Sequence, residues 1–171
     1  RTVCREFGAG LYVSEMINAR PLVDGGGKTL RLADFGPEES PRSLQLYGTD
    51  PHYIAEAVKR LVGEGRIDHL DMNFGCPVPK VTRRGGGAAI PLKPNLLRGI
   101  IRAAVSNAGS IPVTIKFRTG VNDNLMTYLT AGRVGEVGVL VVLQFARHHA
   151  GLLQHGPGRV EAESLPRVVV A

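Results

Sequence analysis

The sequence predicts an α/β fold, an incomplete TIM (β/α)8 barrel with about five parallel strands that alternate with helices. Short β-rich runs alternate with longer segments of helical periodicity, which is typical of βαβ units and a parallel sheet. A doubly wound Rossmann sheet should carry a Gly-x-Gly-x-x-Gly turn after an early strand, and none is present, so the barrel is favoured. Five strands cannot close an eight-stranded barrel of about 250 residues, so we expect the 171-residue chain to be a piece of one.

Five short runs rich in aliphatic and β-branched residues are the predicted strands. The last run, VLVVLQFA, is apolar enough to be buried on both faces of a sheet. The strands are expected at residues 11–17, 43–48, 69–75, 112–118 and 139–146.

Three longer helices are predicted between these strands, and the chain also opens with a helical pattern. The first longer helix begins at Asp50, which suits the N-cap, and Pro51, which suits the first turn. Its apolar residues recur at helical spacing until Gly63 ends it. The other two are expected over residues 94–107 and 125–136.

The chain is basic, with a net charge of +6 and a pI of about 9.7. Such a surplus favours a polyanionic partner such as RNA or DNA, although a merely solvated basic surface explains it equally well. Clustering within one short stretch tips the balance towards a polyanion. The clustered residues are Lys80, Arg83, Arg84, Lys93, Arg98 and Arg102.

Several classes of protein are excluded. Apolar residues make up 43 % and charged residues 21 %, unlike a disordered or fibrous chain. Cys4 and Cys76 are too few for a disulfide framework, and no apolar run reaches the roughly 18 residues of a membrane span. We see no signal peptide and expect a cytoplasmic protein. His148, His149 and His155 have no spacing typical of a metal site, so no metal is expected.

Polar side chains gather where three consecutive predicted strands end. Gln45 lies in the second strand, Asn73 and Cys76 end the third, and Lys116 and Arg118 end the fourth. A barrel enzyme carries its site at the carboxyl ends of its strands. Each residue alone is more often structural, but their joint placement predicts a functional site.

Cys76 stands in a sharp turn between Gly75 and Pro77, which can present its side chain to a pocket. A buried, inert cysteine is the alternative from position alone, because free cysteines commonly pack as small apolar residues. The glycine run at residues 85–87 allows close approach to a ligand or is simply a flexible connection. A second glycine run, at residues 25–27, lacks the upstream glycine and strand of a phosphate-binding P-loop.

The string DMNFGCPVPKVTRRGGGAA at residues 71–89 is similar to the signature of the tRNA-dihydrouridine synthases. Stretches 14–20, 45–48 and 113–118 also match, in the order and approximate spacing of that family. The resemblance covers residues 1–147, so we expect an incomplete FMN-binding TIM-barrel domain there. Residues 148–171 are expected to form a divergent C-terminal tail.

The resemblance implies a flavin barrel that binds FMN, takes electrons from NADPH and reduces uridines in tRNA to dihydrouridine. By that analogy Gln45 and Lys116 contact FMN, Asn73 orients the uracil, and Arg118 lies at the substrate end. Cys76 is then the proton donor, which suits a reduction that needs hydride at one carbon and a proton at the next.

Two alternatives stay open, and departures from the family pattern favour the first of them. Phe145 stands where the family has a histidine that contacts FMN, and the later strands are missing. The first alternative is that the chain is a non-catalytic truncated remnant of the family. The second alternative is another flavin-barrel oxidoreductase that acts on a small molecule.

Overall fold

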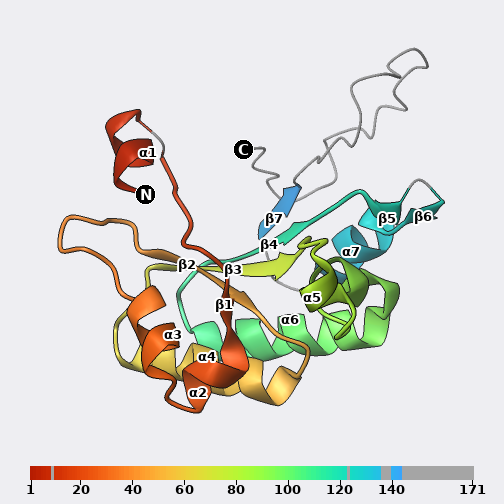
Figure 1. Cartoon of the computed structure of the whole chain (residues 1–171), viewed down its shortest axis with the longest axis horizontal. Coiled ribbons are helices and arrows are strands. Elements are labelled where there is room, and N and C mark those ends of the chain that lie inside the picture. Colours follow the sequence, from red (N-terminus) through yellow and green to blue (C-terminus); the bar gives the residue numbers. More distant parts are fainter. Residues whose placement is uncertain (9, 123, 136–139, 144–171) are drawn as a thin grey trace.

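The computed structural model describes residues 1–8, 10–122, 124–135 and 140–143. Their main sheet has five parallel strands in the order β1-β2-β3-β4-β7, so each strand lies beside its neighbours in the chain (Figure 1). This sequential order is that of a barrel, whereas a doubly wound sheet reverses direction at a switch point. The prediction of an α/β partial barrel is confirmed. The strands are Ile17–Asn18, Ser43–Tyr47, His69–Phe74, Val113–Phe117 and Leu140–Leu143.

Helices cover one face of the sheet, with α4 and α6 lying side by side beneath it in Figure 1. The helix α4 begins as predicted: the Asp50 side chain accepts a hydrogen bond of 2.9 Å from the His52 N–H, and Pro51 occupies the first turn. The helices are α1 Thr2–Glu6, α2 Ala19–Val23, α3 Gly27–Leu32, α4 Pro51–Gly63, α5 Pro79–Thr82, the 3-10 helix η1 Gly87–Leu92, α6 Pro94–Ala108 and α7 Tyr128–Gly135.

The two faces of the sheet differ in chemistry because successive side chains of a strand point to opposite sides. The face towards α4 and α6 is apolar and fully buried; its largest side chains are Leu44, Leu46, Leu70, Met72, Phe74, Ile115 and Phe117. The opposite face is polar. Its residues are Ser43, Gln45, His69, Asp71, Asn73, Thr114 and Lys116. In a barrel this second face lines the packed interior, and Asn73 and Lys116, at the carboxyl ends of their strands, lie nearest the edge where barrel enzymes carry their sites.

The first predicted strand is shorter than expected. Residues 11–17 were predicted, but the strand is Ile17–Asn18, preceded by a single bridge between Val13 and Ser43. The Ser14 N–H donates to the Ser43 carbonyl at 3.0 Å, but the N–H of Gln45 donates to the Ser14 hydroxyl, also at 3.0 Å. A side chain thus replaces a backbone acceptor, which interrupts the ladder.

The segment after β4 also differs from the prediction. A helix was expected over residues 125–136, but Leu125–Met126 (β6) pairs antiparallel with Gly120–Asn122 (β5), so α7 begins only at Tyr128. The loop after β3 contains two short helices that were not predicted. Strand β7 confirms the last predicted strand over Leu140–Leu143. Phe145 and the predicted tail at residues 148–171 lie outside the described residues.

Candidate active site

Four strand neighbours on the polar face form the centre of the candidate site. The register places Gln45 of β2 beside Asp71 of β3, and Asn73 of β3 beside Lys116 of β4. Gln45 and Asn73 are 7 % and 3 % exposed, so their amides must find partners inside the protein.

A chain of hydrogen bonds crosses the three strands. The Thr114 hydroxyl donates to the Asp71 Oδ1 and the Gln45 Nε2 donates to the Asp71 Oδ2, both at 2.5 Å. The Asn73 Nδ2 in turn donates to the Gln45 Oε1 at 2.7 Å. An ionised carboxylate only accepts, so Asp71 fixes which way the Gln45 amide faces, and Gln45 then fixes Asn73.

Asp71 was not predicted as a site residue, although it lies within the quoted motif. Its side chain is 3 % exposed, and burial raises the pKa of its carboxyl group. The hydrogen bonds from Thr114 and Gln45 and the charge of Lys116 oppose that rise in pKa. The sequence did contain a signal for Asp71. It lies two residues from both His69 and Asn73 in one strand, and residues at that spacing point to the same face of the sheet.

Hydrogen bonds to its backbone groups hold the Cys76 turn on both sides. The Asn73 Oδ1 accepts from the N–H of Gly75 at 3.1 Å and from the N–H of Cys76 at 2.9 Å. The Cys76 carbonyl accepts from the N–H of Ala88 at 3.0 Å. The hydrogen-bond chain that begins at Asp71 therefore ends on the backbone of Cys76, whose side chain is half-buried.

Gly87 is the point where the glycine run meets this turn. Its φ is +54°, and a Cβ there would overlap the Cys76 carbonyl oxygen and lie 3.1 Å from the Cys76 Cβ. We expect Gly87→Ala to lower the free energy of unfolding by about 2 kcal/mol or more, measured by urea denaturation.

Gly65→Ala, in the turn that ends α4, is the control for that substitution. Gly65 has a similar φ of +61°, but nothing lies within 4 Å of its Cβ position. It therefore carries the backbone cost without the steric overlap. An equal loss of stability in the two variants would show that the contact with Cys76 is not tight.

Lys116 and Arg118 complete the predicted set. Both side chains are half-buried, and the Arg118 Cγ lies 3.5 Å from the position of a Cβ on Gly75. The structure thus brings Gln45, Asn73 and the Cys76 backbone into direct hydrogen-bonded contact. Lys116 lies beside them on β4, and Arg118 directly follows that strand.

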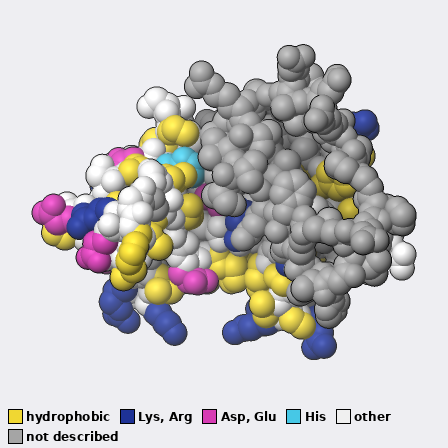
Figure 2. Space-filling view, turned by 90° about the horizontal axis from the view of Figure 1, so that it is seen from above, with side chains coloured by type: hydrophobic (Ala, Val, Ile, Leu, Met, Phe, Trp, Pro, Cys, Tyr) yellow, Lys and Arg dark blue, Asp and Glu magenta, His cyan; other side chains and the backbone are white. Residues whose placement is uncertain are grey.

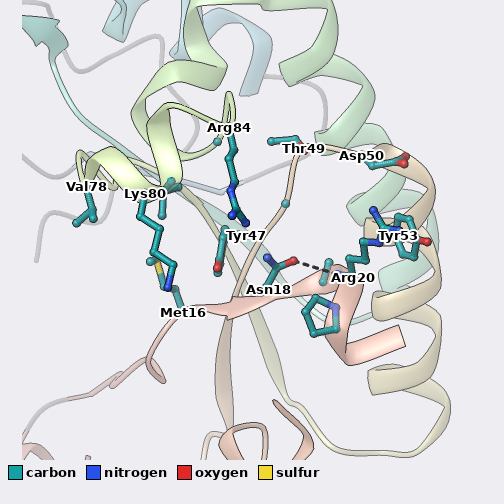
Figure 3. A pocket seen from close by; sticks show the side chains of 15 residues that line it. Met16, Asn18, Arg20, Tyr47, Thr49, Asp50, Tyr53, Val78, Lys80 and Arg84 are labelled. Carbon is teal, nitrogen blue, oxygen red and sulfur yellow. Dashed lines mark hydrogen bonds between the residues drawn. The ribbon is translucent and has the colours of Figure 1, made fainter. Parts of the chain in front are cut away.

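A pocket of about 600 Å³ lies next to the Cys76 turn. It is lined by the ends of β1 and β2, the first turns of α2 and α4, and the loop after β3 (Figure 3). None of the five predicted site residues lines it. Of the basic residues that cluster in the sequence, Lys80 and Arg84 line the pocket, whereas Arg98 and Arg102 lie on α6.

Three further facts come from the surface and from the described residues. Lys and Arg side chains project along the lower edge of the space-filling view in Figure 2, in keeping with the net charge of +6. Among the described helices, none is long and apolar enough for a membrane span. Within the same residues, no three His, Cys, Asp or Glu side chains are grouped to hold a metal ion.

A parallel sheet in sequential order indicates an α/β-barrel protein, and the candidate site with its amide, thiol and cationic groups lies at the carboxyl edge of that sheet. The model of the dihydrouridine synthase (Dus) family matches residues 1–156. The chain therefore belongs to the dihydrouridine synthase family, as the resemblance of its motifs indicated.

Curated relatives support this assignment. The chain is 46 % identical to a probable tRNA-dihydrouridine synthase of Mycobacterium leprae, over 86 % of this chain and 46 % of that protein. It is 45 % identical to a probable tRNA-dihydrouridine synthase of Mycobacterium tuberculosis, over 98 % of this chain and 45 % of that protein. Against tRNA-dihydrouridine synthase B of Xanthomonas campestris the identity is 34 %, over 100 % and 50 %. The chain spans about half the length of these relatives.

Proposed function

We propose that the protein is a tRNA-dihydrouridine synthase, which reduces uridines in tRNA to dihydrouridine with Cys76 as the proton donor. The observation that carries this proposal is the double clamp on the Cys76 backbone by Asn73 and Ala88. That clamp holds a half-buried thiol at the carboxyl edge of the sheet. The relatives named above carry the same activity in their names.

The residues at this edge fit a flavin, and we propose FMN as the cofactor and NADPH as the electron donor. Lys116 brings a cation beside Asn73, and Gln45 retains one amide hydrogen after its bond to Asp71. Both side chains can therefore donate to the polar edge of a flavin ring. When bound, FMN supplies the hydride that the reduction requires.

The remaining chemistry falls to side chains of this chain. Reduction of the uracil double bond adds a hydride at carbon 6 and a proton at carbon 5. The Cys76 thiol donates that proton and regains one from solvent before the next turnover. Asn73 retains one Nδ2 hydrogen, which can donate to a uracil carbonyl, and Arg118 lies at the substrate end.

The substrate must leave its stack to reach this edge, since the neighbouring bases in an RNA helix cover the ring faces from which hydride has to approach. A basic surface then serves to hold the surrounding phosphates. A cytoplasmic location and a division of the chain at residue 147 remain predictions.

The test is to load the full-length protein with FMN and supply NADPH and an unmodified tRNA transcript. We expect a yellow protein that NADPH bleaches, and dihydrouridine detected in the RNA by mass spectrometry. A colourless protein that takes up no FMN would favour the non-catalytic remnant. Bleaching by NADPH without any dihydrouridine would favour an oxidoreductase that acts on a small molecule.

A further inference from the structure

Three basic side chains line the pocket beside the Cys76 turn. Arg20 contributes from α2, Lys80 from α5 and Arg84 from the loop that follows α5. We propose that this pocket binds a backbone phosphate of the RNA next to the target uridine. This inference rests on the proposed function and deepens it by naming the place where the RNA chain is held.

The charges of the pocket are available to a ligand. Among the described residues, neither Lys80 nor Arg84 has a carboxylate within 4.0 Å, and Arg20 has only an exposed pair with Asp24 at 3.7 Å. Of the described residues that line the pocket, Asp50 alone is acidic, and its carboxylate caps α4. Like charges repel one another, and a phosphate would give these cations an opposite charge with which to pair.

Apart from the Asp50 carboxylate, the pocket offers further groups that can donate hydrogen bonds. The Asn18 Oδ1 accepts from the N–H of Arg20 at 3.1 Å, so its NH2 group is what remains to meet a ligand. The Thr49 hydroxyl also lines the pocket, as do the rings of Tyr47 and Tyr53. Donors beside aromatic rings suit a nucleotide, since the rings can pack on a base or ribose while the donors take the phosphate.

The three basic side chains come from opposite sides of the pocket. In Figure 3 Lys80 and Arg84 extend across it towards Met16 and Tyr47, while Arg20 lies over the Tyr53 ring, 5.1 Å from its centroid. The Tyr53 ring thus positions the Arg20 guanidinium without neutralising its charge.

Covalent connection ties this pocket to the candidate active site. Lys80 and Arg84 belong to the loop that begins at Cys76, and that loop is fixed to the Cys76 turn by the Ala88 hydrogen bond. An RNA strand whose uracil reaches Cys76 therefore passes its adjoining phosphates over this loop. A phosphate held here would place the nucleotide before any chemistry begins.

The test is the salt dependence of RNA binding by the full-length protein. The dissociation constant of an unmodified tRNA transcript is measured between about 50 and 200 mM salt for the wild type, Lys80→Met, Arg84→Gln and the double variant. The slope of log Kd against log salt should fall by about one for each substitution and by about two for the double variant. Both residues are exposed, so the variants should keep the far-ultraviolet circular dichroism of the wild type.

Arg102→Gln is the matched control, since Arg102 is equally exposed but lies on α6, outside the pocket. An equal loss of slope in this control would overturn the proposal, because any cation would then serve. NADPH binding is measured in parallel; a loss confined to NADPH would assign the pocket to the dinucleotide instead. The readout is binding, so a protein that forms no dihydrouridine but shows these slopes would refute the proposed function and leave the RNA site standing.

Discussion

Replacing Cys76 by alanine should leave a protein that binds FMN and tRNA but no longer reduces uridine at a useful rate. A positioned general acid contributes about 10² to 10⁴ in rate, so turnover should fall by about that factor. The fold should survive because the contacts that hold the turn are made by the Cys76 backbone, through Asn73 and Ala88, and alanine keeps them. The measurement is dihydrouridine formed per enzyme at saturating NADPH, with flavin absorbance recorded in the same sample.

The chain supplies its own control for that experiment. Cys4 is the other free cysteine; it is exposed on α1, and Cys4→Ala should turn over like the wild type. Cys76→Ser keeps the shape but offers a far weaker acid, so its rate should resemble that of the alanine variant. Unchanged turnover in Cys76→Ala would refute the assigned role of the thiol.

Local signals in the sequence predicted most of the fold. The cap at Asp50 and Pro51 determined where α4 begins, and the apolar spacing within α4 and α6 identified the faces that pack on the sheet. These signals act within a few residues, so one segment contains all that is needed to interpret it. The absence of a Gly-x-Gly-x-x-Gly turn then favoured a barrel over a doubly wound sheet.

Features that depend on contacts between distant segments were not predicted. The first strand is interrupted because a Ser14 side chain reaches Gln45 on another strand. The bonds of Asp71 to Gln45 and Thr114 depend on the register of three strands, which no single run reveals. The pocket likewise forms only when residues near 20 and 80 come together.

Gln45, Asn73 and the Cys76 backbone are in direct contact, with Lys116 and Arg118 close by, and the reason is physical. Parallel strands end at the same edge, so polar residues at the ends of successive strands become neighbours. Their mutual orientation was beyond the sequence, because it is set by a carboxylate that was assigned no role. Asp71 decides how Gln45 and Asn73 face, and Asn73 holds the Cys76 turn.

Removal of that carboxylate should be among the most damaging substitutions in the chain. Asp71→Ala deletes two hydrogen bonds and leaves the Thr114 hydroxyl and the Gln45 amide buried without an acceptor. Each orphaned donor costs about 1–3 kcal/mol, so the free energy of unfolding should fall by about 3–5 kcal/mol. Urea denaturation measures it, and a loss below about 1 kcal/mol would show that the chain of hydrogen bonds is not formed.

Asp71→Asn removes the negative charge of the carboxylate but keeps nearly the same side-chain shape. Asparagine can still accept from the Gln45 Nε2, and its NH2 can donate to the Thr114 hydroxyl, which both donates and accepts. Most of the stability lost in Asp71→Ala should therefore return. Recovery of turnover together with stability would show that Asp71 acts by orienting its neighbours.

The charge itself should appear in the pH dependence of stability. Burial raises the folded-state pKa of Asp71, so the folded protein holds a proton that the unfolded chain releases near pH 3.9. Stability from this group is therefore lost as the pH rises from about 4 through the raised folded-state pKa. The amide in Asp71→Asn cannot titrate, so the wild-type free energy of unfolding minus that of this variant should fall over this range and then level off. A difference that rises with pH would mean that Thr114, Gln45 and Lys116 outweigh burial at this carboxylate.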